Sequence, residues 1–322
     1  MSRQTSQQTI GVVGLGLLGR GIAACFLSRG FRVVGFARDE ASRREALDYV
    51  RHAIDDLVTR GGLPPALREE WPARSVQAAS LADFAECDFV IESVFEDLAV
   101  KRQVFDELEA VVRVDVPIAS NTSALPITTL QQERKKAGRF IGMHWAEPCH
   151  LTRFLEVIRG EHTDDATVSA TLRLAESAGK EPALVNKDVE GFIVNRLGYA
   201  MYREALHLLE SGVADVETID RSFRNAVGLW ANIAGPFRWM DLTGLPAYAA
   251  VMQRLLPKLS TATEVPQTLR KLIEDGAKGI SNGRGFYSYT PAEAAQWERL
   301  LVEHVWRVRA MAEAYFPEER SL

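Results

Sequence analysis

A glycine run placed directly after an apolar segment constrains this chain more than any other feature of its sequence. Residues 10–15 read IGVVGL, a continuous apolar stretch typical of a strand buried on both faces. The run Gly14-Leu15-Gly16-Leu17-Leu18-Gly19 then opens a segment with helical spacing, which Gly30 closes. In a dinucleotide-binding unit such glycines allow a tight turn, close approach of a pyrophosphate and close packing of helix on strand. We therefore predict that this loop, with Leu17 and Leu18, contacts a dinucleotide; the alternative is a purely structural glycine turn.

Strand-like and helix-like segments alternate up to about residue 187. Further strands are predicted at 31–36, 88–94, 116–119, 139–143 and 154–158, and helices at 39–60, 98–112 and 164–178. Strands that alternate with helices build a parallel sheet covered by helices on both faces. The sequence thus predicts an α/β domain over residues 1–187, with a doubly wound sheet of the Rossmann type.

Residues 188–322 have helical periods and no convincing strand. Helices are predicted at 191–211, 215–227, 264–275 and 291–314, and the Gly and Pro cluster at 235–246 predicts a turn between helices. Residues 191–227 carry more apolar side chains than one helical layer can hide, so we expect a homodimer formed through this all-α domain. The crevice between the two domains is the expected ligand site.

Charge and cysteine content narrow the choice of partners. Lys and Arg total 38 against 43 Asp and Glu, a net charge of −5 that does not favour binding to nucleic acid phosphates. Three scattered cysteines indicate neither a disulfide framework nor a metal site. The apolar run at the N-terminus is interrupted by glycines and resembles neither a signal peptide nor a membrane span. We expect a cytoplasmic protein with no nucleic acid, membrane or metal partner.

The end of the second predicted strand bears on which nicotinamide cofactor is used. NAD-binding proteins usually place an acid about 20 residues beyond the glycines, where it accepts from the ribose hydroxyls. Here Ala37 stands in that region and Arg38 follows it. Loss of the acid relieves repulsion of a 2′-phosphate, and a guanidinium can pair with that phosphate. We predict NAD(P)(H) binding with a preference for NADP(H); the alternative is NAD(H), with Arg38 in solvent and Asp39 as a helix cap.

A histidine and a glutamate on two successive predicted strands suggest acid–base chemistry. A dehydrogenase needs a base that takes the alcohol proton as hydride leaves, and histidine suits that task near neutral pH. His144 ends one predicted strand and Glu156 lies in the next. A carboxylate on the other ring nitrogen would orient the imidazole and stabilise the imidazolium. The alternative is a core histidine and an unrelated strand glutamate.

Several motifs occur together in a fixed order. They are the glycine loop, Ser120-Asn121-Thr122-Ser123, the Gly-x-His block ending at His144, the Leu-Glu-Val-Ile strand at 155–158, Gly191-Phe192-Ile193-Val194-Asn195-Arg196 and Gly285-Phe286-Tyr287. In this order the chain resembles the 3-hydroxyacyl-CoA dehydrogenase family, which includes relatives that act on free hydroxy acids, over about residues 8–290. The resemblance implies an oxidoreductase that interconverts a 3-hydroxyacyl substrate, such as 3-hydroxybutyryl-CoA, and its 3-keto form.

The resemblance also implies roles for individual residues. It makes His144 the general base, Glu156 its orienting partner, Ser123 a contact of the reacting oxygen and the cofactor, and Asn195 the residue that positions the substrate carbonyl. Glu96 and Lys101 match family positions that line the cofactor site. The helical half resembles the domain through which the family dimerises.

The chain departs from the family pattern in three places. Ser281 stands about where members have a lysine that faces the cofactor, and Lys278 lies three residues before it. Glu147 stands where members have an asparagine close to the nicotinamide. Ala53, Asp55, Asp56 and Arg60 stand on the helix where members that bind CoA have hydroxyl and basic groups. This leaves a dehydrogenase of a free or carrier-bound 3-hydroxy acid as an alternative. A dinucleotide-binding module without turnover is a further alternative, against which the joint presence of the four implied catalytic residues argues.

Overall fold

The computed structural model describes residues 8–317 and divides the chain into two compact units, Met1–Arg196 and Leu197–Leu322. The N-terminal segment was expected not to be a signal peptide. Its first seven residues lie outside the described range. The boundary expected from the change of sequence pattern, between residues 187 and 188, precedes this division. Helix α7 (Val194–Glu210) starts in the first unit and continues into the second.

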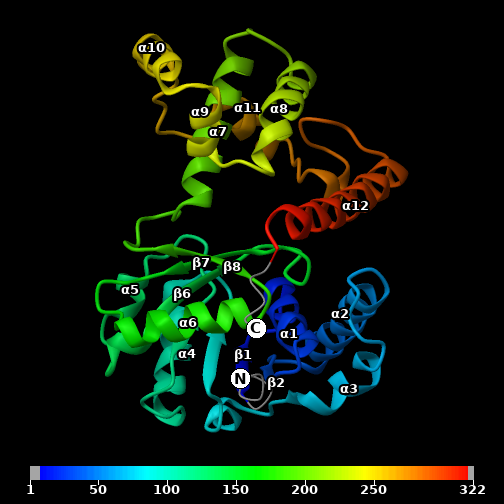
Figure 1. Ribbon diagram of the computed structural model, residues 1–322, viewed down its shortest axis with the longest axis vertical. Helices are drawn as coiled ribbons and strands as arrows, with labels where there is room; N and C mark the ends of the chain where they lie inside the picture. Colours follow the sequence, from blue (N-terminus) through cyan, green and yellow to red (C-terminus); the bar gives the residue numbers. More distant parts are fainter. Residues whose placement is uncertain (1–7, 318–322) are drawn as a thin grey trace. The chain divides into compact units, whose positions relative to one another are not determined.

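Within the described residues, the first unit is built on an eight-stranded sheet with the order β3-β2-β1-β4-β5-β6-β7-β8 (Figure 1). The strands are β1 (Thr9–Val13), β2 (Arg32–Phe36), β3 (Ser75–Gln77), β4 (Phe89–Glu92), β5 (Ile118–Ser120), β6 (Phe140–Trp145), β7 (Phe154–Ile158) and β8 (Glu181–Val185). Neighbouring strands are parallel, except that β7 runs antiparallel to β6. The predicted Rossmann-type domain is confirmed. The expectation of a wholly parallel sheet is wrong at β7, because the short connection 146–153 has no room for the crossover helix that a parallel pair needs.

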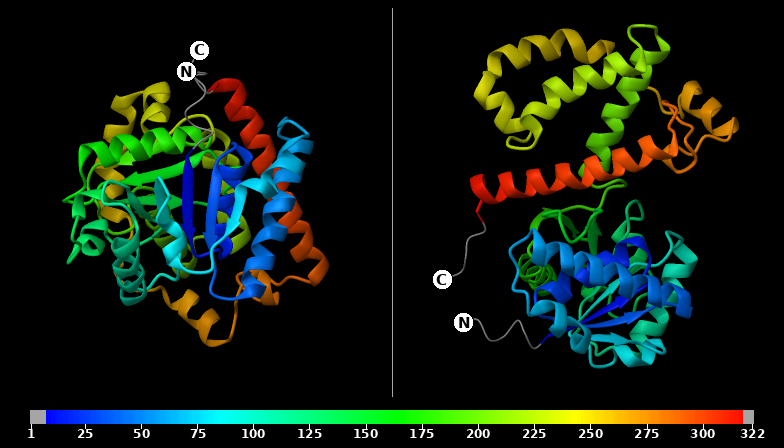
Figure 2. Two further views of the ribbon diagram at one scale, coloured as in Figure 1. Left: turned by 90° about the horizontal axis from the view of Figure 1, so that it is seen from below. Right: turned by 90° about the vertical axis from the view of Figure 1, so that its right-hand side faces the viewer.

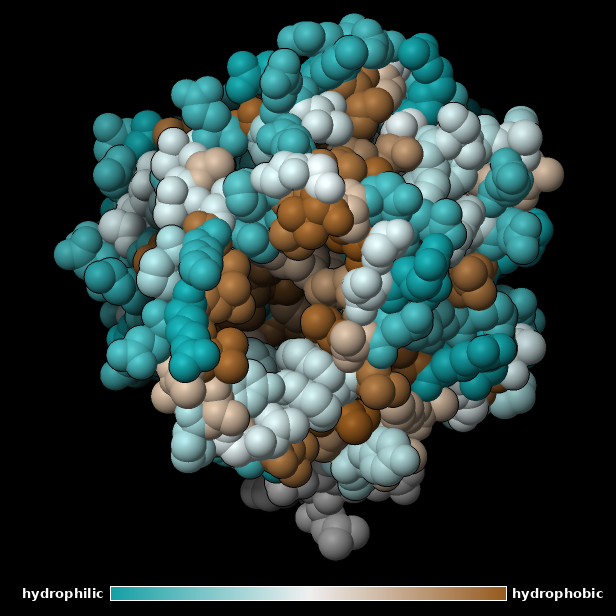
Figure 3. Space-filling model, turned by 90° about the horizontal axis from the view of Figure 1, so that it is seen from above, coloured by the Kyte–Doolittle hydropathy of each residue, from teal (hydrophilic) through white to brown (hydrophobic). Residues whose placement is uncertain are grey.

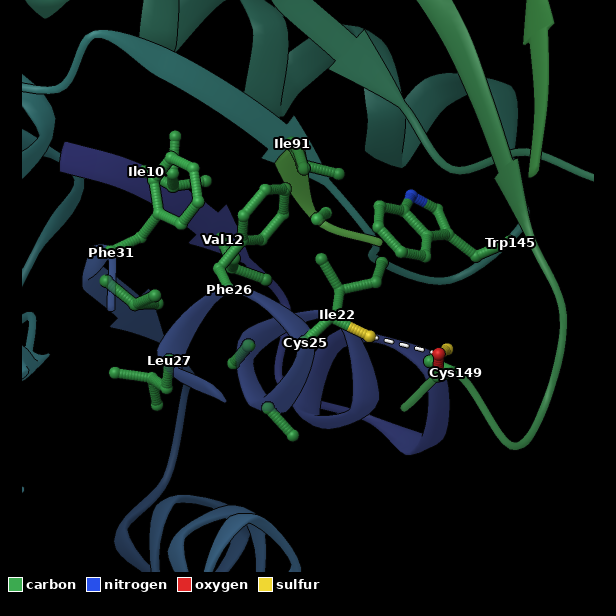
Figure 4. Packing of buried hydrophobic residues seen from close by; sticks show 14 of the residues in the cluster. Ile10, Val12, Ile22, Cys25, Phe26, Leu27, Phe31, Ile91, Trp145 and Cys149 are labelled. Carbon is green, nitrogen blue, oxygen red and sulfur yellow. Dashed lines mark hydrogen bonds between the residues drawn. The ribbon is translucent and has the colours of Figure 1, made fainter. Parts of the chain in front are cut away.

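Helices cover both faces of the sheet (Figures 1 and 2). The helices of this unit are α1 (Leu17–Ser28), α2 (Glu40–Thr59), α3 (Leu67–Arg74), α4 (Leu98–Val111), α5 (Ile127–Gln131) and α6 (Asp165–Ser177). Successive residues of one strand point to opposite faces, so Val12 and Val13 enter two separate apolar clusters. The first cluster packs α1, α2, α3 and α6 on the sheet, and the second packs α4 and α5 on it. Figure 4 shows the part of the first cluster in which α1 side chains such as Ile22 and Phe26 lie near Val12 of β1 and Trp145 of β6. Short elements such as β3, β8, α3 and α5 were not predicted.

The second unit is helical, as predicted. It contains the rest of α7, then α8 (Val216–Ala231), α9 (Pro236–Thr243), α10 (Leu245–Leu255), α11 (Gln267–Glu274) and α12 (Pro291–Tyr315). The predicted turn at 235–246 is wrong, because α9 and α10 occupy it and only Gly244, at φ +103°, separates them. Pro236 and Pro246 stand in the first turns of these helices, where a missing N–H costs little. Within residues 8–317, no helix combines the length and the apolar character that crossing a membrane requires.

Much apolar surface of the helical unit is exposed. None of the described side chains of α7, α8, α9, α10 and α11 is buried, although each helix carries apolar residues. Leu229 is 75% exposed and Phe237 78%. Figure 3 shows such residues in brown among polar ones. An apolar helix face of this kind normally packs against another layer of structure.

Candidate active site

The glycine loop between β1 and α1 has the geometry that a bound dinucleotide requires. Gly14 has φ +94°, and a Cβ there would lie 2.5 Å from the Ser93 carbonyl oxygen. A Cβ on Gly19 would lie 1.8 Å from the Gly14 oxygen, so α1 packs directly on the loop, whereas a Cβ on Gly16 would meet nothing within 4 Å. Among the described residues no side chain caps the start of α1, and Leu17 is exposed. Open space at Gly16 and uncapped N–H groups therefore fit a pyrophosphate.

The turn after β2 holds the residues that bear on the adenine ribose. Ala37 is buried, and Arg38 is exposed without a hydrogen-bond or ion-pair partner among residues 8–317. The Asp39 carboxylate accepts hydrogen bonds from the Ser42 backbone N–H and hydroxyl, each at 2.8 Å. Asp39 is therefore the N-cap of α2, and its carboxylate is committed to that helix.

His144 and Glu156 face each other across the antiparallel pair of β6 and β7. The register places the two residues directly opposite, so their side chains leave the sheet on the same face. His144 Nδ1 lies 2.8 Å from Glu156 Oε2, and both side chains are buried. Because a carboxylate accepts, we assign the proton to Nδ1, which leaves Nε2 as the nitrogen that can take a proton from a substrate.

The second oxygen of Glu156 binds the start of α7. Glu156 Oε1 accepts from the backbone N–H groups of Ile193 at 3.0 Å and Val194 at 2.9 Å. Burial raises the pKa of Glu156, but the hydrogen bonds from His144 and from these two N–H groups outweigh burial, and the pKa is lowered overall. Glu156 is therefore an anion that serves both the imidazole and the helix terminus.

Two aromatic rings that the sequence analysis missed hold the imidazole. The Phe154 ring lies 5.9 Å from the His144 ring in an edge-on arrangement, and the Phe192 ring lies 5.7 Å from it. Phe192 is 1% exposed and has φ +48°, a conformation uncommon outside glycine. No sequence pattern signals a left-handed phenylalanine, because neighbouring contacts impose it.

Ser123 lies exposed on the loop after β5, which Glu96 and Asn195 secure. Glu96 Oε1 accepts from the Thr122 hydroxyl at 2.5 Å and from the N–H groups of Ser123 at 2.9 Å and Ala124 at 3.1 Å. Asn195, in the first turn of α7, donates from Nδ2 to the Ser123 carbonyl oxygen at 3.1 Å. One continuous chain of contacts thus brings Glu96, Ser123 and Asn195 together with the start of α7, and through it with Glu156 and His144.

Lys101 lies beneath this loop in a fully buried ion pair. Its Nζ is 2.8 Å and 3.0 Å from the two oxygens of Glu92, and 3.3 Å from Glu96 Oε2. Both Lys101 and Glu92 are 0% exposed. The Ser120 hydroxyl also donates to Glu92, at 2.6 Å. Lys101 therefore reaches the site surface only through Glu96. Glu92 was not predicted as a site residue, although an acid at the end of the apolar strand 89–92 is a recognisable sequence feature.

Glu147 lies against α1 and α2 and shares no described contact with the His144–Glu156 pair. Its Oε2 accepts from the Tyr49 hydroxyl at 3.2 Å and from the Cys149 N–H at 3.3 Å. A Cβ on Gly21 would lie 3.2 Å from its Oε1. Burial raises the pKa of Glu147, although the hydrogen bond from Tyr49 opposes the rise. In residues 8–317 neither this cluster nor another gathers three side chains that could hold a metal ion.

Two family models match the chain, one for each part of this architecture. Residues 9–189 match the NAD-binding domain of 3-hydroxyacyl-CoA dehydrogenase, and residues 191–289 match the C-terminal domain of the same enzyme. The chain belongs to the 3-hydroxyacyl-CoA dehydrogenase family. It is an NAD-dependent oxidoreductase of that type, so the family and enzyme class predicted from the motifs are confirmed.

Two of the relatives differ in the substrate that their names give. A 5-formyl-3-hydroxy-2-methylpyridine 4-carboxylate 5-dehydrogenase of Mesorhizobium japonicum is 33% identical over 91% of this chain and 94% of its own. A 3-hydroxybutyryl-CoA dehydrogenase of Bradyrhizobium diazoefficiens is 34% identical over 88% of this chain and 96% of its own.

Solved structures include a match of each of these two kinds. The crystal structure of a 5-formyl-3-hydroxy-2-methylpyridine 4-carboxylic acid 5-dehydrogenase, described as an NAD+-dependent dismutase, matches at a TM-score of 0.86 with 32% identity, over 96% of this chain and 98% of its own. The (S)-3-hydroxybutyryl-CoA dehydrogenase of Ralstonia eutropha matches at 0.74 with 33% identity, over 88% of this chain and 99% of its own. Helix α12 begins at Pro291, beyond the region that the C-terminal family model matches.

Proposed function

We propose that this protein interconverts a 3-hydroxyacyl substrate, such as 3-hydroxybutyryl-CoA, and its 3-keto form. The observation that carries the proposal is the buried pair of His144 and Glu156, with Nδ1 and Oε2 2.8 Å apart. A protein that only held a dinucleotide would have no use for a base with an ionised orienting partner. The pair therefore argues against a binding module without turnover.

The bound dinucleotide supplies the hydride acceptor for oxidation and the hydride donor for reduction. In oxidation His144 takes the hydroxyl proton at Nε2 while Nδ1 keeps its hydrogen bond to Glu156. The Glu156 anion stabilises the imidazolium that results, and its bonds to the start of α7 keep it from turning away. In reduction the same nitrogen returns the proton to the carbonyl oxygen.

Ser123 and Asn195 orient the substrate in this proposal. The Ser123 hydroxyl contacts the reacting oxygen, and the loop that carries it is fixed from below by Glu96. Asn195 positions the substrate carbonyl, and its side chain is held against the Ser123 backbone by the hydrogen bond to the Ser123 carbonyl oxygen. Geometry held in this way lowers the entropic cost of reaching the reactive arrangement.

A dehydrogenase of a free acid is the second candidate. The observation that favours it is the match to the pyridine-carboxylate dehydrogenase, which covers 96% of this chain. That match therefore includes at least part of α12, whereas the match to the Ralstonia enzyme covers 88% of this chain. On α2, Ala53 is buried, and Asp55 pairs with Arg68 in place of the hydroxyl and basic groups implied for CoA binding. A free 3-hydroxy acid, or a ring acid related to that relative's substrate, would need no such groups.

Parallel assays of cofactor turnover test these candidates. Acetoacetyl-CoA and free 3-keto acids are compared at equal concentrations by consumption of the reduced cofactor, NADH or NADPH. 5-Formyl-3-hydroxy-2-methylpyridine 4-carboxylate is compared by formation of NADH from NAD+, and the largest kcat/KM is expected with acetoacetyl-CoA. A larger value with an acid that lacks CoA selects the second candidate. His144→Gln should lower kcat/KM by about 10²–10⁴-fold while cofactor binding persists. The matched control is His52→Gln on the exposed face of α2, which should change neither quantity. A His144→Gln enzyme within a few fold of the wild type would remove His144 from the mechanism.

For the cofactor, we propose that NADP(H) binds more tightly than NAD(H). Support comes from the turn after β2, where Asp39 already caps α2 and Arg38 is unpaired among the described residues. A 2′-phosphate at this turn would gain a charge-assisted hydrogen bond from Arg38. The matching family model is described as NAD-binding and one solved relative as NAD+-dependent, so this preference would differ from both.

For assembly and location, we propose a cytoplasmic homodimer formed through the helical unit. The exposed apolar side chains of α7, α8, α9, α10 and α11 support the dimer, because a second copy would cover them. The three cysteines are buried and free, which supports a reducing compartment.

A further inference from the structure

We propose that the turn Gly191–Phe192 is a positioning element for the catalytic pair. It aims two backbone N–H groups at Glu156 and one aromatic ring at His144. The inference rests on the roles of these two residues in the proposed function. The turn belongs to a motif that the sequence analysis used only for Asn195.

The backbone of the turn explains how the N–H groups are aimed. Gly191 has φ +77° and Phe192 has φ +48°, so two successive residues adopt the left-handed conformation. The chain reverses there and enters α7, which places the N–H groups of Ile193 and Val194 side by side on one oxygen, Glu156 Oε1. With ordinary negative φ angles at 191 and 192 the two donors would point elsewhere.

The consequence for Glu156 is that both carboxylate oxygens are occupied. Oε1 receives the two N–H groups and Oε2 receives the His144 Nδ1 proton at 2.8 Å. The start of a helix also favours an anion. The carboxylate therefore remains ionised and has no freedom to rotate away from the imidazole.

The turn at Gly191 and Phe192 also fixes the position of His144. The buried Phe192 side chain lies against the imidazole at 5.7 Å between ring centres, with Phe154 at 5.9 Å. The imidazole thus has aromatic contacts from two elements and a hydrogen bond at Nδ1. One turn of the chain fixes the base and its partner at once.

Gly191→Ala tests the inference, with Gly212→Ala as its matched control. A Cβ on Gly191 would have its nearest neighbours at 3.5 Å, so the substitution perturbs the backbone conformation and not the packing. Gly212 follows α7, has φ +67° and offers open space around a Cβ, so Gly212→Ala imposes the same backbone strain away from the pair. Gly191→Ala should lower kcat by roughly 10- to 100-fold, as misplacement by about 1 Å does, with the Kd of the cofactor unchanged. Gly212→Ala should leave kcat within about twofold of the wild type, because its strain lies away from the reacting groups.

The pH profile separates positioning from a structural role. The two N–H donors help to hold the pKa of Glu156 down, so their loss raises that pKa and Glu156 takes up a proton at a higher pH. His144 is the titratable group in contact with Glu156. The acid limb of kcat should therefore move to higher pH in Gly191→Ala and stay in place in Gly212→Ala. Equal losses of kcat in both variants, with unmoved acid limbs, would overturn the inference.

A readout without substrate keeps this inference distinct from the proposed function. Nitrogen-15 NMR of histidine-labelled protein reports whether the His144 proton sits on Nδ1. The wild type and Gly212→Ala should show one Nδ1–H tautomer, and Gly191→Ala a mixture. The expected NMR result in a protein that turns over none of the substrates would refute the proposed function and leave the positioning role intact. An unaltered tautomer in a folded Gly191→Ala protein would refute the positioning role.

Discussion

Replacing Lys101 by methionine should destabilise the first unit strongly. The substitution removes the counter-charge of Glu92, whose carboxylate is 0% exposed and whose remaining donors are the Ser120 hydroxyl and the Val94 N–H. Breaking a buried ion pair from one side costs about 3–5 kcal/mol of unfolding free energy, because a charge stays behind without a partner. For a unit that ends at Arg196, this corresponds to a fall in Tm of about 7–12 °C.

The loss should depend on pH in a defined direction. Burial raises the pKa of Glu92, and the charge of Lys101 opposes that rise. Without Lys101 the folded-state pKa of Glu92 moves further above its unfolded value. The destabilisation by the buried charge is then absent when the pH is below the unfolded-state pKa of Glu92 and complete when the pH is above the folded-state pKa. Lys101→Met should therefore lose less stability at pH 5 than at pH 8.

Urea unfolding of the full chain, followed by tryptophan fluorescence at both pH values, measures this loss. The double variant Glu92→Gln/Lys101→Met removes both charges and should recover most of the lost free energy. Arg51→Met is the control for deleting a cation, because Arg51 and Asp48 form an exposed pair whose loss should cost less than about 1 kcal/mol. A Lys101→Met loss as small as that of Arg51→Met at pH 8 would refute the reasoning, since it would mean that water reaches Glu92.

Three further predictions concern the site and the assembly. Glu156→Gln should lower kcat less than His144→Gln and shift the pH profile, because an amide cannot stabilise the imidazolium; an unchanged profile would reduce Glu156 to a structural role. Arg38→Ala should weaken NADPH binding by roughly 10- to 100-fold and leave NADH unaffected, and Ala37→Asp should favour NADH; titrations in which the wild type binds NADH as tightly as NADPH would contradict this. Sedimentation at micromolar concentration should give a dimer, and a species of 35.8 kDa alone would exclude one.

Local periodic patterns of apolar residues predicted most of the helices and strands of the first unit. Apolar runs and helical spacing predicted β1, α1, α2 and α4 within a few residues, because burial on known faces dictates those patterns. The direction of β7 depends instead on the length of the connection before it. The helices at 236–255 were missed because proline and glycine were interpreted as a turn, although proline is compatible with a first helical turn.

The candidate site was predictable where residue type alone indicates chemistry. His144, Glu156 and Ser123 stand out as an acid–base pair and a hydroxyl within recognisable motifs. Glu92, Phe154 and the left-handed Phe192 do not, because their importance comes from what tertiary packing brings against them. A single sequence does not contain that information in a local pattern.

Because β6 and β7 pair directly with each other, the geometry of the His144–Glu156 pair does not depend on the residue types in the chain that joins the two strands. Strand register sets the separation of His144 and Glu156, and this register holds as long as the connection 146–153 keeps its length. That connection can exchange residue types, such as an amide for the carboxylate at Glu147, while the proton transfer keeps its geometry. Residue types in this connection can therefore differ from one family member to the next on an unchanged catalytic frame.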